Sequence, residues 1–289
     1  MTVDYGNRGF KPYEELEFSD DFMFGKVMED LSLCHDVLEC LLQRKIGKLE
    51  AVETQREFRF TSDGKPIRLD IFSYTKEEVF DAEAQNLNKR SVESLMLPKR
   101  SRFYQASVDL DLLKKRKAYK ELPESTILFI CTFDPFGKGL GQYTFCERCL
   151  EDDGLFLGDG TTKIFYNCTY KGDGLPDDLQ KLYEYMDGGS PGNALTRRID
   201  EAVVQARKIE EWRSTYMKEM VLLMDAREEG REEGREEGRA EERRKTEAER
   251  RKAEAERKKA EAEQRRADVA EARVKELEAM LAAISKPAS

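Results

Sequence analysis

The sequence has one histidine among its 289 residues and no run of about 18 consecutive apolar residues. With His35 alone, mechanisms that need two histidines are excluded, and a histidine-based catalytic triad is disfavoured. Without a long apolar run, no helix is expected to span a membrane. Residues 1–17 are polar and mixed in charge, without the apolar stretch of a signal peptide, so we expect a cytoplasmic protein.

Nucleotide-binding loops are missing as well. The segment 138–141 is too short for a phosphate loop, and neither a P-loop nor a dinucleotide fingerprint occurs. The six cysteines are expected to be reduced in a cytoplasmic protein. Cys146 and Cys149 have the spacing of zinc ligands, but a second pair is lacking. Reduced core cysteines are therefore the better interpretation, and a zinc site is the weaker one.

A surplus of basic charge is also missing. The net charge is −9, and the segment from Arg227 to the C-terminus carries 18 basic and 18 acidic residues, leaving 32 and 41 in residues 1–226. The whole negative surplus therefore lies in the body. Because an acidic body does not attract phosphate backbones broadly, any nucleic-acid contact requires a local basic patch or a bound cation.

Helix-type and strand-type patterns alternate along the body, of which enough is apolar for one sizeable core or two small ones. We expect helices over residues 18–44, 91–119, 176–187 and 194–224. We expect strands over residues 52–60, 68–74, 79–85, 125–133, 142–149 and 162–170. The order predicts an α/β fold with one mixed sheet flanked by helices.

The strands around Asp70 and Glu83 are joined by a short polar break, which predicts a hairpin. Because side chains alternate along a strand, Asp81, Glu83 and Gln85 share one face. Carboxylates and a carboxamide on neighbouring strands supply the hard oxygen ligands that Mg²⁺ prefers. For Asp81 the alternative is a position at the strand edge, in water.

Several further motifs accompany this hairpin in a fixed order. They are Phe18–Phe24 (FSDDFMF), Arg68–Ile71 (RLDI), Asp81–Gln85 (DAEAQ), Lys99–Gln105 (KRSRFYQ), Ile130–Gly137 (ICTFDPFG) and the Arg-Glu-Glu-Gly repeats of residues 227–238. Together, over about residues 15–240, they resemble the PD-(D/E)XK nuclease superfamily. The resemblance is to its recombination-promoting nuclease or transposase-like branch, whose strand reads Glu-x-Gln where the superfamily has Glu-x-Lys.

The resemblance implies a restriction-endonuclease-like core with a mixed β-sheet flanked by helices, followed by a long charged C-terminal helix. It divides the chain into an N-terminal extension (1–17), a nuclease-like domain (18–190), a helical extension (191–226) and a charged helix (227–289). The implied activity is metal-dependent hydrolysis of DNA phosphodiester bonds, in the service of recombination or transposition.

The resemblance also implies roles for individual residues. Asp70 and Glu83 would hold Mg²⁺ or Mn²⁺, and Gln85 would orient the attacking water or bind the metal through its carbonyl. Asp21, or its neighbour Asp20, would be the acid that the first helix adds. The alternative for this pair is an N-cap, which we favour for at least one of the two, and Ser19 is a further N-cap candidate.

Arg100, Arg102 and Tyr104 match the DNA-contacting second helix of the family, and the two arginines would contact phosphates. The alternative is a solvated helix face. Because Gln85 cannot supply a lysine's charge, a second function is also considered: a catalytically inactive protein that keeps the fold and binds partners through its tail.

The tail combines charge repeats with a short apolar seam. Gly230, Gly234 and Gly238 each cost about 1 kcal/mol of helix stability, so the segment is expected to be weakened or hinge-like, and residues 227–266 are interpreted as a solvated charged helix. The seam has apolar residues three and four apart and would support weak homo-oligomerisation at most. Its members are Ala267, Ala270, Val274, Leu277, Leu281 and Ile284.

Overall fold

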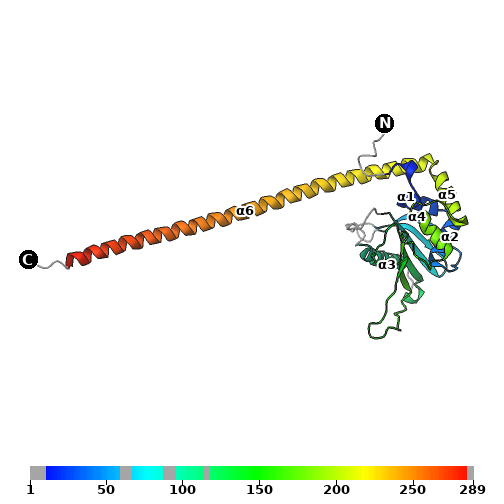
Figure 1. The fold of residues 1–289 in the computed structure, drawn as a ribbon, viewed down its shortest axis with the longest axis horizontal. Coiled ribbons are helices and arrows are strands. Elements are labelled where there is room, and N and C mark those ends of the chain that lie inside the picture. The colour runs from blue at the N-terminus through cyan, green and yellow to red at the C-terminus, as the bar shows by residue number, and fades with distance from the viewer. Residues whose placement is uncertain (1–10, 59–66, 87–95, 114–117, 285–289) are drawn as a thin grey trace, which may run out of the picture. The chain divides into compact units, whose positions relative to one another are not determined.

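Six strands form one mixed β-sheet in the computed structural model, which describes residues 11–58, 67–86, 96–113 and 118–284 (Figure 1). The strands are β1 (Ala51–Phe58), β2 (Ile67–Tyr74), β3 (Glu78–Gln85), β4 (Glu124–Cys131), β5 (Gln142–Phe145) and β6 (Thr161–Asn167). Their spatial order is β1-β2-β3-β4-β6-β5, in which β3, β4 and β6 run parallel and the other neighbours are antiparallel. The predicted α/β fold with a mixed sheet is confirmed.

Helices lie on both faces of this sheet (Figure 1). The helices are α1 (Asp21–Met28), α2 (Leu31–Leu42), α3 (Leu97–Leu113), α4 (Asp177–Met186), α5 (Ala194–Ala206) and α6 (Glu210–Ile284), with short 3₁₀ turns η1 (Tyr13–Glu15) and η3 (Tyr119–Glu121). α1, α2, α4 and α5 pack together on one face, and α3 covers the other.

The two faces of β4 show why the sequence places this strand at the centre. Phe129 points toward α3, where it lies in the same buried cluster as Tyr104 and Val108. On the opposite face Tyr166 of β6 donates its hydroxyl hydrogen to the carbonyl of Leu41 in α2, at 3.0 Å. A strand covered on both faces has to be apolar throughout, as the run over residues 125–133 predicts.

Two predicted helices are each divided in the structure. The expected helix over 18–44 is wrong as a single element, because the Asp30 carboxylate accepts a hydrogen bond from the Leu33 N–H at 2.9 Å and starts α2 anew. The expected helix over 194–224 ends at Ala206, and α6 begins at Glu210. Between them the Arg207 guanidinium donates to the Leu16 carbonyl, at 2.6 and 3.0 Å. Each break ends one helix and lets the next begin in a new direction.

The core-cysteine prediction holds for four residues and fails for two. Cys34, Cys40, Cys131 and Cys168 are buried. Cys146 is exposed and Cys149 is half-buried, because both follow the end of β5 and lie outside the helix-covered sheet. All six are free thiols.

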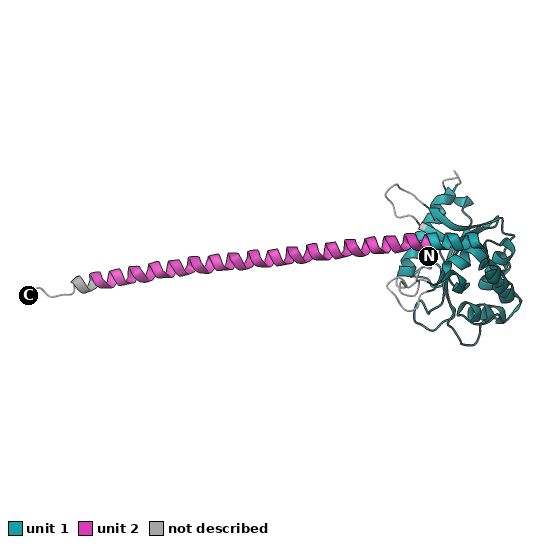
Figure 2. Cartoon of the chain, turned by 90° about the horizontal axis from the view of Figure 1, so that it is seen from above, with its two compact units in different colours: residues 1–218 teal, residues 219–289 magenta. Residues whose placement is uncertain are grey.

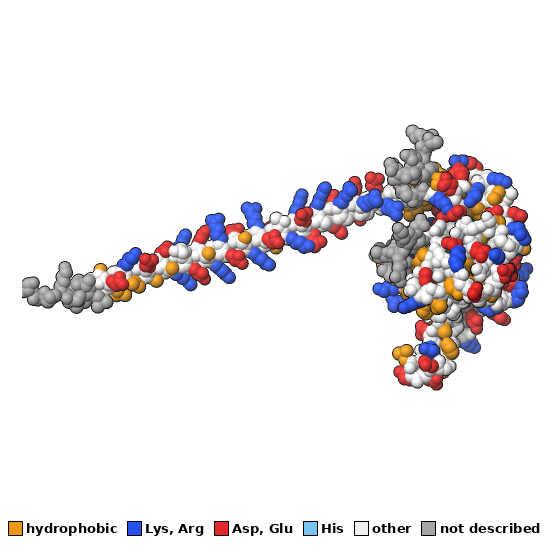
Figure 3. Space-filling view, in the orientation of Figure 1, with side chains coloured by type: hydrophobic (Ala, Val, Ile, Leu, Met, Phe, Trp, Pro, Cys, Tyr) orange, Lys and Arg blue, Asp and Glu red, His pale blue; other side chains and the backbone are white. Residues whose placement is uncertain are grey.

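The chain divides into two compact units, residues 1–218 and 219–289 (Figure 2). The second unit consists of the later part of α6, whose basic and acidic side chains are interspersed along its length (Figure 3). The predicted long charged helix is confirmed, and it runs without a break through Gly230, Gly234 and Gly238. No helix in the described part of the chain is long and apolar enough to cross a membrane.

Parts of three expectations fall outside the described residues. They are the end of the first expected strand (59–60), the start of the expected helix over 91–119 together with its residues 114–117, and the chain end at 285–289. Residues 1–10 of the expected N-terminal extension lie outside the description as well.

Candidate active site

The β2–β3 hairpin brings Asp70 and Glu83 together. The Cα register pairs Tyr74 with Val79 and continues to Ile71 opposite Ala82. At the following residue the Asp70 backbone N–H donates to the Glu83 Oε1 at 2.9 Å. A side chain thus takes the place of a strand partner, and the two acids lie beside each other where this hairpin ladder ends.

β3 presents its polar side chains to the face covered by α3. Asp81, Glu83 and Gln85 are 0%, 1% and 9% exposed, and Asp70 is 7% exposed. They share this face with Val79, which lies in the cluster beneath α3, as the alternation predicts. The alternative of a water-exposed strand edge for Asp81 is wrong. In the described part of the chain neither Asp81 oxygen has a hydrogen-bond partner.

Burial and mutual repulsion perturb these acids. Burial raises the pKa of Asp70 well above its ordinary value, and the charges of Glu83 and Asp21 add to the effect. Burial and the charge of Asp81 likewise raise the pKa of Glu83. Burial and Asp70 do the same for Asp81, whose pKa also lies well above the ordinary range. Three acids therefore stand in one region of low polarity, and each favours its neutral form.

Two arginines face this group: Arg68, whose charge lowers the pKa of Asp70, and Arg100, which makes a direct hydrogen bond to Glu83 of β3. From α3 the Arg100 Nη1 donates to Gln85 Oε1 at 2.8 Å, and its Nη2 donates to Glu83 Oε2 at 3.1 Å. The Tyr104 hydroxyl accepts from Nη2 at 2.8 Å, and the guanidinium lies 5.6 Å from the centroid of the Phe129 ring. The Arg100 guanidinium is thereby held by the side chains of Gln85, Glu83 and Tyr104 and by the face of the Phe129 ring.

The start of α1 supplies the remaining acids. Asp21 contributes to the raised pKa of Asp70, which places its charge near that carboxylate. Asp20 occupies the N-cap position, but its side chain does not cap the helix. Its carboxylate instead accepts from the Glu17 N–H at 2.7 Å and from Asn86 Nδ2 at 3.0 Å. Instead of capping α1, the Asp20 side chain therefore links the N-terminal segment to the end of β3 by hydrogen bonds.

These groups line one cleft of about 400 Å³. Its lining residues are Asp20, Asp21, Arg68, Asp70, Glu83, Ala84, Gln85, Asn86 and Arg100. The predicted metal-binding and catalytic residues are all among them. Arg68 and Asn86 were missed by the sequence reasoning, although each lies within two residues of a predicted site residue.

The three residues expected to contact DNA lie in different environments. Arg100 points into the cleft, whereas Arg102 is exposed outside it. The Tyr104 ring is buried and stacks on Phe129 at a centroid distance of 6.1 Å. In this structure Tyr104 therefore positions Arg100 rather than lining the cleft.

A different cluster has the tightest potential ligand spacing. Among the described residues, His35, Asp36 and Glu39 are the one group of three that offers ligand atoms within 4.8 Å of one another, so Asp21, Asp70 and Glu83 are spaced more widely. Asp36 is already paired with Arg198, and Glu39 with Lys45 at 2.6 Å.

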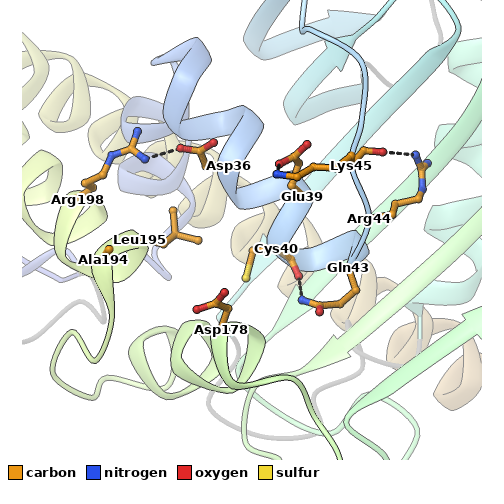
Figure 4. Close-up of a pocket in the computed structure, with 10 residues that line it drawn as sticks. All are labelled: Asp36, Glu39, Cys40, Gln43, Arg44, Lys45, Asp178, Ala194, Leu195 and Arg198. Carbon is orange, nitrogen blue, oxygen red and sulfur yellow. Dashed lines mark hydrogen bonds and ion pairs between the residues drawn. The ribbon is translucent and has the colours of Figure 1, made fainter.

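The His35 cluster borders a mixed-charge pocket of about 580 Å³ (Figure 4). Figure 4 shows Asp36 turned toward Arg198, and Glu39 lying beside Lys45. Its acids are thus neutralised by their own neighbours. The acids of the β2–β3 cleft face Arg68 and Arg100 and remain strongly perturbed.

No family model, no curated protein and no solved structure matches this chain. The chemistry of the cleft is therefore inferred from its own residues, which are four acids, the carboxamides of Gln85 and Asn86, and the guanidinium groups of Arg68 and Arg100.

Proposed function

We propose that the protein is a metal-dependent DNA endonuclease with a restriction-endonuclease-like core of the PD-(D/E)XK type. The observation that carries the proposal is the convergence of Asp70, Glu83, Gln85 and Asp21 on one cleft that also contains Arg100. They come from two strands and two helices far apart in the sequence. Such a concentration of perturbed acids in a cleft is typical of sites that do chemistry.

The donor set fits a hard divalent cation. Carboxylate oxygens of Asp70, Glu83 and Asp21 and the carbonyl of Gln85 are the ligands that Mg²⁺ and Mn²⁺ prefer. The charge of Glu83 raises the pKa of Asp70, and the charge of Asp81 raises the pKa of Glu83, so a dication bound among these acids would offset the repulsion. When bound, the metal would lower the pKa of a water molecule and stabilise charge on a phosphate.

Arg100 would perform the part that a strand lysine has in the wider superfamily. Gln85 has no charge and cannot act as a base at neutral pH, but its Oε1 holds the Arg100 guanidinium at 2.8 Å. A guanidinium can donate two parallel hydrogen bonds to a phosphate. The cation that β3 lacks would thus be supplied by α3, with Gln85 and Tyr104 as its positioning residues.

Plasmid cleavage with Mg²⁺ or Mn²⁺ tests the metal-binding acids. Asp70→Asn and Glu83→Gln should each lower cleavage by on the order of 100-fold or more, because each removes a proposed ligand. Both substitutions replace a strained buried acid by a neutral isostere, so the fold should be retained. Glu201→Gln, at an exposed acid outside the cleft, is the matched control and should cut normally. Equal cleavage by all four proteins, or by none while all are folded, would reject an endonuclease for that substrate.

The role of Arg100 has its own matched pair. Arg100→Gln should lower cleavage by on the order of 100-fold, as expected for loss of a charge that stabilises the transition state. Arg197→Gln, at an exposed arginine of α5, should have no effect. Arg100→Lys should recover part of the activity because it restores the charge without the planar fork. Full activity in Arg100→Gln would assign the arginine to structure alone.

One observation favours a second function, that of a catalytically inactive protein that binds partners or self-associates through its tail. Arg100 already donates hydrogen bonds to Glu83 and Gln85, so both side chains have a partner within the chain without a metal ion or DNA. In that case calorimetry would detect no binding of Mn²⁺ to the folded wild type. If the tail seam holds copies together, deletion of residues 267–289 would then reduce the number of chains in the assembly, as measured by its mass in solution.

A further inference from the structure

An ordered arm extends from the edge of the sheet between β5 and β6. It comprises residues 145–157, and Figure 1 shows it in green, projecting beyond the sheet. Arg148 and Phe156 form an antiparallel bridge. The Cys149 N–H donates to the Leu155 carbonyl at 2.9 Å, and the Leu157 N–H to the Glu147 carbonyl at 3.0 Å. The arm is therefore a hydrogen-bonded hairpin with a defined shape.

The arm exposes large apolar side chains. Leu150, Leu155, Phe156 and Leu157 are 93%, 55%, 56% and 63% exposed. Single exposed apolar residues are common on protein surfaces, but a contiguous group on a projecting element marks an interaction site. A two-stranded hairpin is at best marginally stable alone, so contact with another protein surface would stabilise this arm.

The charge of the arm restricts what that partner can be. Glu147, Glu151, Asp152 and Asp153 outnumber its single basic residue, Arg148. Acidic and apolar side chains lie beside each other on the projecting part of Figure 3. Such a surface repels nucleic acid and anionic lipid, and it matches a basic surface with apolar residues.

The outer side of α3 has this complementary character. Phe103 and Leu110 of α3 and Met96 immediately before the helix are 52%, 50% and 52% exposed, and they recur every seven residues, which aligns them on one stripe. Lys99 and Arg102 are exposed beside the stripe. The inner side of the same helix is already occupied, because its apolar residues pack on the sheet. The outer stripe is thus an apolar face bordered by two positive charges.

We propose that the arm of one chain docks on the outer face of α3 in a second copy, and that the contact is made reciprocally in a two-fold dimer. An acidic apolar element and a basic apolar face on one chain are what a self-complementary interface requires. The proposal does not rest on the endonuclease function. If that function holds, the interface uses the outer side of the helix that carries Arg100 and leaves the cleft residues outside the contact.

Charge-swap variants of the full-length chain test the contact by sedimentation or light scattering. Glu151→Lys/Asp153→Lys places positive charge opposite the basic face, and Lys99→Glu/Arg102→Glu places negative charge opposite the arm. Each variant alone should dimerise at least about tenfold more weakly than the wild type. An equimolar mixture should recover the dimer, because both contacts in the mixed pair are then complementary. The altered side chains are exposed. The contacts that Asp153 makes with Arg148 at 3.4 Å and Glu151 with Cys149 at 3.2 Å lie on the surface and contribute little to stability, so the thermal unfolding of each variant should change by little.

The apolar part of the contact has a separate test. Leu150→Ser should weaken the dimer by about tenfold, whereas Leu31→Ser, at an exposed leucine of α2, should not. A wild type that stays monomeric, or a mixture of charge-swap variants that does not recover the dimer, would overturn the proposal. So would a dimer that survives both charge swaps and is lost in Val274→Ser/Leu277→Ser, which would assign association to the tail seam.

Discussion

Asp81 is a buried acid whose charged form destabilises the folded state. It is fully buried, and no donor among the described residues reaches its ionised carboxylate; the neighbouring Glu83 can share a hydrogen bond with it when one of the two acids is protonated. The alternation of β3 predicts which face it occupies, because a two-residue period is local information. Its depth could not be predicted, because burial depends on α3, which follows later in the chain and packs over that face.

Replacing Asp81 by Asn should stabilise the protein at neutral pH by about 1–3 kcal/mol, because it removes a negative charge that burial and Asp70 disfavour. Because burial and Asp70 raise the pKa of Asp81 in the folded state, the fold binds this proton more tightly than the unfolded chain does. Stability is then fully present below the ordinary pKa of 3.8 and declines as pH rises through the raised value. The advantage of Asp81→Asn should therefore shrink toward acid pH in denaturant unfolding experiments.

Asp134→Asn provides a control of opposite sign. Burial alone would raise the pKa of Asp134, but the Tyr143 hydroxyl and backbone N–H groups that donate to its carboxylate hold it below the ordinary value. Its contribution to stability is present above pH 3.8 and is lost as pH falls through the lowered pKa. Asp134→Asn should thus destabilise at neutral pH. Parallel behaviour of the two variants would contradict the assignment for Asp81.

Arg100 marks the limit of what a motif shows at the residue scale. The sequence places Arg100 on a helix after Gln85, and the family resemblance implies that it contacts phosphates. The sequence does not predict that Arg100 contacts Gln85, because the two lie 15 residues apart and are joined only when α3 packs on the sheet. The uncharged Gln85 alone therefore gives an incomplete account of the charge in the cleft.

At the scale of elements, local signals predict the strands well and the helix breaks poorly. The apolar run of β4 and the alternation of β3 give their faces directly. The break before α2 was recoverable from the sequence, since Asp30 precedes an apolar helix-spaced run as an N-cap does. The break before α6 was not, because Arg207 contacts Leu16, 191 residues away.

The glycines of α6 give a prediction at this scale. The positions where Cβ atoms would be added at Gly230, Gly234 and Gly238 have no atom within 4 Å. Alanine at each should therefore stabilise the helix by about 1 kcal/mol without a clash. Far-UV circular dichroism of the triple variant should retain helix signal to higher temperature. Ala240→Gly, an exposed position in the same helix, should have the reverse effect, and an unchanged melting profile in both would contradict a propensity-controlled helix.

At the scale of the whole molecule, charge is distributed according to how each unit is stabilised. The first unit buries apolar residues on both faces of its sheet. Most of the second is a helix with charge on all sides, supported by pairs four residues apart such as Glu241–Lys245 at 2.8 Å and Glu247–Arg251 at 2.6 Å. Such pairs are local, so the charged helix was predictable from its repeats, whereas the arrangement of the cleft required long-range packing.

Deleting residues 219–289 should leave the first unit folded and functional. The residues of the cleft, the arm and α3 all lie in residues 1–218, and the large apolar side chains of 221–223 are substantially exposed. We expect an unchanged melting temperature, unchanged Mn²⁺ affinity by calorimetry and an unchanged dimer by light scattering, with a smaller helix signal. The same deletion combined with Leu150→Ser should weaken the dimer by about tenfold, as Leu150→Ser does in the full-length chain, because the tail does not take part in the proposed contact. A truncated chain that melts at a clearly lower temperature would mean that the charged helix contributes to the stability of the first unit.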